Sequence, residues 1–361
     1  MTKRGQRKGP VMFALVALTA LILVAGAAWI WMERPSTKRL EITLAYVPVT
    51  QILPLLVAED EGLFTREGLS VRLLKFQAPN QVIDALVSGR AQVGSGPALI
   101  TLLALQQFPG SLNVLGLTGG SATGAKPLYQ DALLTLRDSP ITNSADLRGK
   151  KLGITPGIHW RFLVRTLLKN QGLDPDHDVQ IQEIPLAQHI PALLNGDVEA
   201  TLSLEPVGAV AEATGRLVRR ETNPAARHVV DPCLSGAYLM TKAFRDAHPR
   251  EAAAYINVLR EATAKVQADF PKYRPLFARA LGLQPEQLEH MTDLFYAWPD
   301  DPETAASYQK LADLFRAEGV LKDPFDVRTV LYAPAPSTAH PTNTGIPVEL
   351  TGTKYSSTHL K

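Results

Sequence analysis

The sequence predicts an α/β protein made of two similar halves. Residues Ile42–Phe64 comprise an apolar strand, a short loop and a helix that stops at a glycine, and Lys151–Leu173 repeat this order. Ala85–Pro97 and Ala192–Pro206 also match, because each has a helix end, a glycine, a short strand and a proline suited to a new helix start. This alternation indicates a doubly wound, mostly parallel sheet in each half.

The elements of the first half follow from apolar runs and the residues that punctuate them. Asn80 suits the N-cap of a helix over Gln81–Ser88, and Pro97 suits the first position of a helix that reaches Gln107. Gly119–Gly124 are expected to form a loop. The expected strands are Ile42–Tyr46, Leu69–Phe76, Ala91–Gly94 and Leu112–Leu117.

A crossing strand leads into the second half, and another leads back. Ala132–Leu136 are expected to cross and Ala237–Thr241 to return, after which Lys242–Gly319 are expected to be helical, with a long amphipathic helix at Glu251–Phe270. The remaining elements are a short helix at Ser144–Leu147 and strands at Lys151–Ile154, Val179–Glu183 and Glu199–Ser203.

The N-terminus predicts a membrane segment. Val11–Met32 follow a basic stretch and contain no charged residue, which matches the roughly 20 residues that span a bilayer. A cleavable signal peptide is the alternative, because Ala25–Ala27 resemble a cleavage site. We favour an uncleaved anchor, since Ala28–Met32 continue the apolar run and contain two tryptophans. Either way, the body is expected outside the cytoplasm.

Four parts are therefore expected. Residues 1–35 form the anchor or signal segment, 40–133 together with 237–332 form lobe I, and 134–236 form lobe II. Residues 333–361 are low in apolar content, rich in Pro, Ser and Thr, and expected to be disordered.

Composition argues against several functions. The formal charge is +2, and beyond the first 34 residues the chain carries 32 basic against 34 acidic residues, so nucleic-acid binding is not expected. Cys233 is the only cysteine, which excludes an internal disulfide and a cysteine-based metal cluster. No nucleophile elbow, Walker loop or metalloprotease motif is present. We expect neither cofactor, metal site nor catalysis.

Four motifs resemble one known family. Leu53–Phe64, Gln81–Pro97, Asp138–Gly157 and Ala192–Pro206 occur in the order seen in solute-binding proteins of ABC importers for nitrate, sulfonate, taurine and thiamine-pyrimidine precursors. The resemblance covers Leu40–Tyr332. It implies the two-lobe type II periplasmic binding protein fold, with hinge closure over a small molecule and delivery to a permease and its ATPase.

The chain also departs from this family. Relatives often have Trp, Asp and Pro where this chain has Ser203–Pro206, so the aromatic wall that tryptophan would supply is missing. Fungal pyrimidine-synthesising relatives carry a cysteine-rich motif that this chain lacks. The ligand therefore stays open among a sulfonate, nitrate, a taurine-like zwitterion and a pyrimidine precursor.

The ligand site is expected at the carboxyl ends of the strands, where open α/β sheets bind ligands. Segments from both halves end there and are expected to hold a ligand from two sides. The predicted ligand-binding residues are Val47, Thr50, Gln51, Ser95, Gly96, Pro97, Gly157, His159, Trp160, Arg161 and Glu205.

Two of these groups have a structural alternative. Trp160 is suited to stacking and Arg161 to pairing with an acid, but His159 and Arg161 are equally suited to exposed first-turn positions, with Trp160 packed on its own helix. Glu205 is suited either to binding an amine or to capping the helix opened by Pro206. His189 and His228 are expected at the surface, and Met240, Phe295, Tyr296 and Trp298 in packing.

The expected function is an extracytoplasmic, monomeric solute receptor held at the inner membrane by its N-terminal helix. Two alternatives remain. One is an enzyme on the same fold, acting on a small cyclic acid or a pyrimidine with His159 and Glu205 as acid and base. The other is a membrane-tethered ligand sensor.

Overall fold

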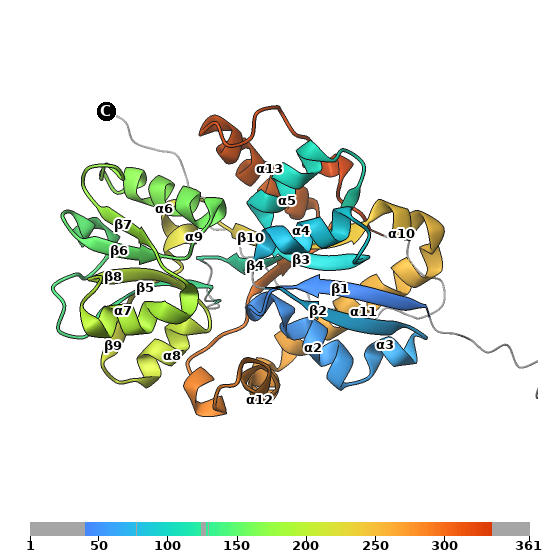
Figure 1. Ribbon diagram of the computed structural model, residues 1–361, viewed down its shortest axis with the longest axis horizontal. Helices are drawn as coiled ribbons and strands as arrows, with labels where there is room; N and C mark the ends of the chain where they lie inside the picture. The colour runs from blue at the N-terminus through green and yellow to red at the C-terminus, as the bar shows by residue number, and fades with distance from the viewer. Residues whose placement is uncertain (1–39, 77, 124–127, 129, 334–361) are drawn as a thin grey trace, which may run out of the picture.

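Two β-sheets, one in each half, organise the chain (Figure 1). The computed structural model describes residues 40–333 except 77, 124–127 and 129. The first sheet has the order β11-β4-β10-β3-β1-β2 and the second β7-β6-β8-β5-β9. The first contains β1 (Glu41–Tyr46), β2 (Ser70–Lys75), β3 (Val93–Pro97), β4 (Leu112–Ser121), β10 (Cys233–Thr241) and β11 (Phe295–Ala297). The second contains β5 (Asp131–Leu136), β6 (Lys151–Ile154), β7 (Gln180–Glu183), β8 (Ala200–Leu204) and β9 (Leu217–Thr222).

The two sheets repeat one arrangement of strands. β1 lies between β2 and β3 and is parallel to both, and β6 lies in the same way between β7 and β8. β10 and β5 then follow next to β3 and β8 and run antiparallel to them. The predicted pair of like units is confirmed. Each sheet is nevertheless mixed rather than mostly parallel, because the strands that connect the halves enter antiparallel.

Helices cover both faces of the first sheet and surround the second. In the first half these are α2 (Leu53–Asp60), α3 (Leu63–Arg66), α4 (Pro79–Val87), α5 (Ala98–Gln107), α10 (Lys242–Ala247), α11 (Pro249–Ala268), α12 (Phe270–Leu281) and α13 (Pro302–Ala317). The second half has α6 (Ile158–Asn170), α7 (His189–Asn195), α8 (Val207–Ala213) and α9 (Pro224–His228). Short 3₁₀ turns are η1 (Thr50–Ile52), η2 (Ser144–Leu147), η3 (Leu186–Gln188), η4 (Pro285–Leu288) and η5 (Val327–Thr329).

Alternating side chains of β1 show why the first sheet is covered on both faces. Ile42 and Leu44 belong to an apolar cluster with α2, α3, α11 and α12, whereas Ala45 belongs to one with α4, α5 and α13. Successive residues of a strand point to opposite faces, so an uninterrupted apolar run requires helices on both sides. Both faces of β1 are therefore covered by helices.

Several expected boundaries were wrong. β4 continues through Gly119 and Gly120, which had been expected in a loop. A Cβ at Gly120 would lie 2.9 Å from the Phe295 side chain, so the glycine gives room for β11 to pair with β4. β9 and β11 were not predicted, and β11 interrupts the expected helical region. Ala78, not Asn80, is the N-cap of α4.

The structure describes the body but not the predicted anchor and most of the tail. Residues 1–35 lie outside the described part, as do 334–361. Among the described residues, no helix combines the length and apolar character needed to cross a membrane. β5 already begins at Asp131, in the second sheet, and β10 at Cys233, in the first.

Candidate functional site

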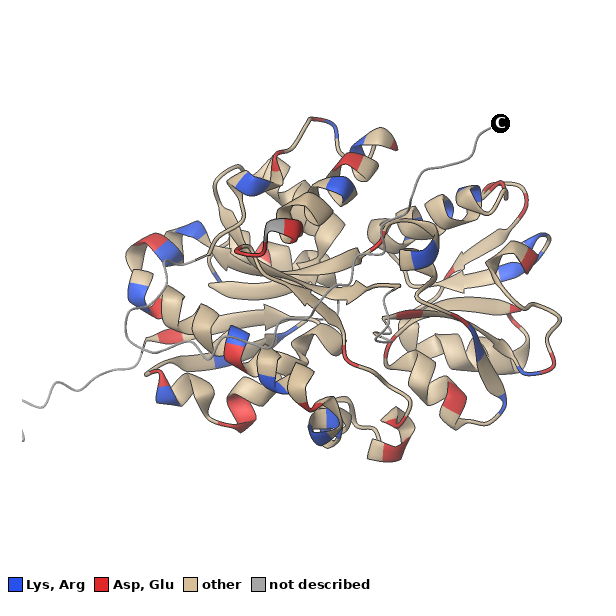
Figure 2. Ribbon diagram, turned by 180° about the vertical axis from the view of Figure 1, so that it is seen from behind, with Lys and Arg blue, Asp and Glu red and all other residues tan. Residues whose placement is uncertain are grey.

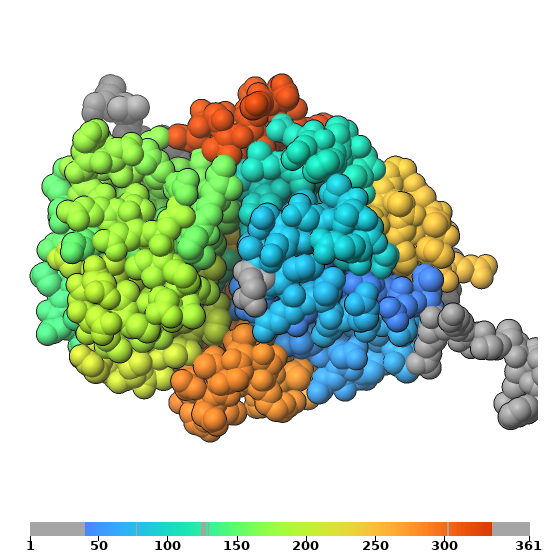
Figure 3. All heavy atoms as spheres, viewed as in Figure 1, coloured from blue at the N-terminus to red at the C-terminus, as the bar shows by residue number. Residues whose placement is uncertain are grey.

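The two halves meet along two sets of helices. α6 of the second half lies against α5 and α13, and α8 lies against η4. Figure 3 shows the halves in contact along a seam, with the segment around η4 below it. Phe162 of α6 packs edge-on against Phe315 of α13, with ring centroids 4.6 Å apart, and Ala209 of α8 is buried in the apolar cluster of the first half. The two halves are therefore in direct contact through α6 and α8.

Thr50 connects the first unit directly to the second. Thr50 is buried in η1, immediately after β1, and its hydroxyl donates to the carbonyl oxygen of Glu205 across the seam, at 3.0 Å. The backbone of Gln51 is held by the first half itself, because Tyr238 Oη of β10 donates to its carbonyl oxygen at 2.7 Å. Val47 precedes this turn and is half-buried. The loop Val47–Gln51 thus lies at the junction of the halves, against Glu205.

β3 extends through Ser95, Gly96 and Pro97, beyond the expected strand at Ala91–Gly94, so Pro97 is not the first residue of a helix as expected. They pair with β10, with Gly96 opposite Ala237, and α5 begins only at Ala98. Ser95 is buried, and among the described residues its hydroxyl has no hydrogen-bond partner in the protein. It is therefore a polar group at a strand end that a ligand can satisfy without disturbing an existing bond.

A carboxylate of the protein occupies the start of α6. Glu183, at the end of β7, accepts from Gly157 N at 3.3 Å and from Arg161 Nε at 2.5 Å. Gly157 has a φ of 116°, a conformation that favours glycine, and this turn leads the chain from β6 into α6. Arg161 is exposed, as one alternative expected. The anion-binding features predicted here are already engaged by Glu183.

His159 and Trp160 lie inside the protein instead of at its surface. His159 is only 2% exposed, and its ring meets the rings of Trp160 and Phe315 at centroid distances of 5.3 and 6.1 Å. Neither ring nitrogen has a hydrogen-bond partner among the described residues. Burial lowers the pKa of His159 to about 3, so the imidazole is neutral at neutral pH. The alternative that places His159 at an exposed position is therefore wrong, since Phe315 of α13 covers this helical turn.

Glu205 serves the structure of the second half. One of its carboxylate oxygens accepts from Ala209 N at 3.1 Å, in the first turn of α8, and the other pairs with the buried guanidinium of Arg219. Burial raises the pKa of Glu205, and Arg219 opposes this rise. Arg219 also pairs with Glu212 at 3.1 Å. Glu205 thus accepts from the first turn of α8, as the capping alternative expected, but α8 begins at Val207 and its N-cap is Pro206. An amine ligand would compete with Arg219 for this carboxylate.

A polar cluster that the sequence did not reveal joins the two crossings between the halves. We call Ser121, Gln130, Asp131, Asn223 and Ser235 the crossing cluster. Gln130 Nε2 donates to Ser235 Oγ, and Ser235 donates to the carbonyl of Gly119 at 2.5 Å. Asn223 Nδ2 donates to the carbonyl of Leu128 at 2.7 Å. The sequence signal for this cluster was Asp131, a charged residue at the start of an apolar strand. The composition of a strand, however, does not show which groups such a residue contacts.

Two other histidine expectations met different outcomes. His189 is buried, with Nδ1 2.8 Å from Ser203 Oγ and Nε2 3.0 Å from the carbonyl oxygen of Ile184, so its expected surface position was wrong. His228 is half-buried and lies 3.3 Å from Glu221. Met240 and Tyr296 are buried, which confirms their expected role in packing.

The two residues considered as acid and base, His159 and Glu205, are each engaged within the fold. His159 is neutral and enclosed by aromatic rings, and Glu205 is committed to Arg219, so neither is positioned as an acid or base for the other. In the described part of the chain, no group of three or more His, Cys, Asp or Glu side chains is arranged to hold a metal ion.

Basic and acidic residues are interspersed over both halves in Figure 2.

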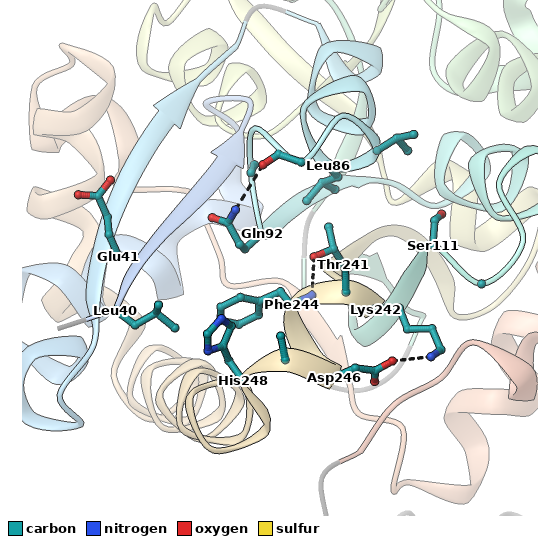
Figure 4. Close-up of a pocket in the computed structure, with 16 residues that line it drawn as sticks. Leu40, Glu41, Leu86, Gln92, Ser111, Thr241, Lys242, Phe244, Asp246 and His248 are labelled. Atoms are coloured by element: carbon teal, nitrogen blue, oxygen red, sulfur yellow. Dashed lines mark hydrogen bonds and ion pairs between the residues drawn. The ribbon is translucent and has the colours of Figure 1, made fainter. Parts of the chain in front are cut away.

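A separate surface cavity of about 650 Å³ lies away from these residues (Figure 4). It opens beside Glu41 at the start of β1 and Gln92 just before β3, with Phe244 and His248 of the α10 region on another side. None of the predicted ligand-binding residues lines it. It lies at the amino ends of β1 and β3, the end opposite to that at which open α/β sheets bind ligands.

Comparisons with known proteins agree with this fold. The bicarbonate-binding protein CmpA of Synechococcus sp. is 25% identical over 203 residues, covering 49% of this chain and 45% of CmpA. The 4-amino-5-hydroxymethyl-2-methylpyrimidine phosphate synthase THI13 of Saccharomyces cerevisiae is 24% identical, covering 65% and 68%. The chain spans less than half the length of the bicarbonate-transport relatives that it matches.

Solved structures and a family model extend the comparison. The periplasmic aliphatic sulphonate binding protein SsuA of Escherichia coli aligns with a TM-score of 0.65 and 20% identity, covering 81% of this chain and 97% of SsuA, which shows the fold. Residues 36–281 match the model of the NMT1-like family. Because this match spans well over half of the chain, the protein belongs to the NMT1-like family.

Proposed function

We propose that the protein is the extracytoplasmic solute-binding component of an ABC importer, which closes its two lobes over a small molecule and delivers it to a permease and ATPase. Membership of the NMT1-like family, the SsuA-like fold and the relationship to a bicarbonate-binding protein support this function. In this proposal, residues 40–133 with 237–332 form lobe I and 134–236 form lobe II. The N-terminal segment holds the monomer at the inner membrane.

The contact between Thr50 and Glu205 carries the proposal. It joins the carboxyl end of β1 to that of β8, so the equivalent strand ends of two like sheets face each other. A small molecule at this junction would contact both halves and so favour the closed form over an open one. A binding protein of this kind requires that ligand binding favours the closed form. A site on a single sheet would not couple the ligand to closure in this way.

The pairing of the charged side chains near the junction indicates what kind of ligand the site would bind. Arg161 is paired with Glu183, and Arg219 with Glu205 and Glu212. Thr50, Gln51 and Ser95 offer hydrogen bonds without charge. We therefore propose a ligand recognised mainly by hydrogen bonds, such as a pyrimidine precursor, ahead of sulfonate, nitrate or a taurine-like zwitterion, since an anion must first displace Glu183 to reach Arg161.

A ligand screen tests the function. Thermal unfolding of the full chain would be followed with a methylaminopyrimidine, taurine, an alkanesulfonate, nitrate and bicarbonate. A binder of the folded state alone raises the unfolding temperature with its concentration. The pyrimidine is expected to give the largest rise. No rise with any of the five, in protein that unfolds cooperatively, would contradict the proposed ligand set.

Ser95→Ala provides a matched test of the site. Because the Ser95 hydroxyl has no protein partner among the described residues, its removal is expected to leave stability nearly unchanged and to weaken binding by roughly three- to tenfold, the worth of one hydrogen bond. Ser307→Ala on α13 is the control and should bind like the unaltered protein. Equal affinities of both variants would remove Ser95 from the site.

An enzyme on the same fold is the second candidate, favoured by the similarity to THI13. Its test is recovery of the bound molecule by mass spectrometry after long incubation. Unchanged ligand supports binding alone. A product that is absent with Thr50→Val and present with the unaltered chain would favour the enzyme.

A further inference from the structure

Gln51 is held both through its backbone and beneath its side chain. Tyr238 on β10 is only 1% exposed, and its hydroxyl donates to the Gln51 carbonyl oxygen at 2.7 Å. A Cβ added at Gly119 on β4 would lie 2.3 Å from Gln51 Nε2 and 2.9 Å from both Cδ and Cγ of the same side chain. These separations are well below van der Waals contact. The Gln51 side chain therefore lies where any other residue at position 119 would have its own side chain.

Two independent features require glycine at position 119. The φ of Gly119 is 67°, in the left-handed region that other residues rarely adopt, and the Gln51 side chain takes the space of a Cβ. The backbone at this point is held in turn, because Ser235 Oγ donates to the Gly119 carbonyl oxygen at 2.5 Å. Gln51 thus rests on a part of β4 that is itself hydrogen-bonded to β10.

The carboxamide of Gln51 is not used by the described part of the protein. No hydrogen bond joins its oxygen or its nitrogen to another described residue, although Gln51 is half-buried. The preceding residue, Thr50, donates to Glu205 of the second half at 3.0 Å, so Gln51 lies at the junction of the halves. A planar polar group that is held in place at this junction is suited to recognise a ligand.

The chemistry of a carboxamide defines the ligand edge that fits it. Its oxygen accepts a hydrogen bond and its NH₂ group donates one, side by side in one plane. The matching edge carries an adjacent donor and acceptor, such as an amino group next to a ring nitrogen, and Asn and Gln read adenine by this pairing. Nitrate and sulfonate offer acceptors only. The oxygen of the carboxamide would lose water to them without gaining a partner.

We propose that Gly119 and Tyr238 are positioning residues, which hold the Gln51 carboxamide so that it selects ligands with an amino group next to a ring nitrogen. A side chain that is already held in one orientation loses little conformational freedom on binding, which favours affinity and selectivity. The presence of a ligand at this junction rests on the proposed function, whereas the positioning of Gln51 does not.

Chemical denaturation tests the positioning without any ligand. Gly119→Ala is compared with Gly62→Ala, because Gly62 has a φ of 66° and an added Cβ there would meet nothing within 4 Å. Both variants carry the same kind of backbone strain, but only the first crowds Gln51. The denaturation midpoint of Gly119→Ala is expected to fall further, and Gln51→Ala added to it is expected to recover the excess. Equal midpoints of the two alanine variants, or no recovery, would overturn the proposal.

Ligand selectivity tests the recognition, with 4-amino-2-methylpyrimidine and 2-methylpyrimidine as probes of the full chain. The two probes differ only in the amino group, whose absence is expected to weaken binding roughly tenfold, within the worth of a bidentate pair. The ratio of the two affinities is expected to fall toward one in Gln51→Ala and Gly119→Ala and to stay unchanged in Gly62→Ala. An unchanged ratio in Gln51→Ala or Gly119→Ala would overturn the proposal.

Tyr238→Phe keeps the selectivity test decisive if Gly119→Ala fails to fold. It removes the hydroxyl that donates to Gln51 and should lower the ratio of affinities. Tyr308→Phe is the control and should not lower it, because the buried Tyr308 hydroxyl has no hydrogen-bond partner among the described residues. Equal ratios in these two variants would overturn the proposal.

Binding by the unaltered chain separates this proposal from the proposed function. If the unaltered chain binds neither pyrimidine, the recognition by Gln51 is overturned. A rise of the unfolding temperature with another of the screened molecules would then show that the receptor function itself survives.

Discussion

The corner after β1 and the corner after β6 have the same local sequence pattern but different surroundings. After β1, the turn η1 offers Thr50 to the opposite half through a hydrogen bond. After β6, Gly157 and Arg161 bind Glu183 of their own half, and His159 is enclosed by aromatic rings. One corner is therefore a polar contact between the halves and the other is largely closed by packing. Equivalent positions in a repeated unit do not imply equivalent roles.

The largest expected effect concerns the partner of the first corner, Glu205. Arg219→Ala would leave this buried carboxylate without its cation, and breaking a buried ion pair in this way costs about 3–5 kcal/mol. Chemical denaturation measures the loss. Arg216→Ala, at an exposed arginine three residues earlier, should change the free energy of unfolding by less than about 0.5 kcal/mol. Similar small losses in both variants would mean that Glu205 is not buried as a charge.

The second-largest effect is a pH dependence of stability that arises from His159, at the corner after β6. The folded pKa of His159 is about 3 against 6.5 when unfolded, so the unfolded chain binds the additional proton between these values. The contribution of His159 to stability is complete above pH 6.5 and falls with decreasing pH by about 1.4 kcal/mol per unit. Relative to pH 7.5, the unaltered protein should lose about 2 kcal/mol at pH 5 through this residue.

His159→Leu should lack this loss, whereas His290→Leu, at an exposed histidine, should retain it. The comparison with these variants removes the contributions of other groups, including that of Asp131, whose raised pKa acts in the opposite direction between pH 6 and 3.8. Denaturation at several pH values checks the result. Parallel profiles for the unaltered protein and His159→Leu would show that the imidazole reaches water when folded.

A smaller effect is expected at the contact between the corner after β1 and the end of β8. Thr50→Val keeps the shape of the side chain but removes the hydroxyl that donates to Glu205, at a cost of about 1 kcal/mol. The loss should appear mainly as a more open protein in small-angle scattering. Thr65→Val, at an exposed threonine of α3, should change neither stability nor size. An unchanged radius of gyration for Thr50→Val would mean that this bond does not hold the halves together.

The smallest effect is expected at Arg161. Its pair with Glu183 is exposed, so Arg161→Ala should cost less than about 1 kcal/mol, as should Arg165→Ala, which breaks the exposed pair with Asp176. Ligand affinity separates the two. If an acidic ligand replaces Glu183, only Arg161→Ala should weaken its binding, and equal affinity in both variants would support the hydrogen-bonded ligand proposed above.

Much of the fold could be predicted from local sequence. The strand at Lys151–Ile154 was placed correctly at both ends. The helix expected within Ile42–Phe64 ends at Asp60, shortly before a glycine as predicted, because Gly62 adopts a φ of 66°. Glycine, proline and apolar periodicity act within a few residues, so they report on elements reliably. β11 escaped prediction because a three-residue strand carries little pattern and depends on pairing with a distant β4.

The candidate site could be predicted less completely, because its chemistry depends on contacts between distant residues. Glu205 was recognised, but not that Arg219 would engage it. His159 was recognised, but not that Phe315, more than 150 residues later, would cover it. Charge pairing and burial are long-range properties, and neither has a signature within a motif.

The opening pattern, two strand-to-helix units in one chain, follows from local sequence because each unit needs only its own apolar spacing and its own helix ends. Which groups of these units are open to a ligand is a property of tertiary structure. Packing against α13 encloses His159, a neighbouring strand end brings Glu183 to the start of α6, and the meeting of two chain connections buries Asp131. Each of these outcomes depends on how far a group is removed from water and on which partner it meets. Both are set by contacts between distant residues, which exist only in the folded chain.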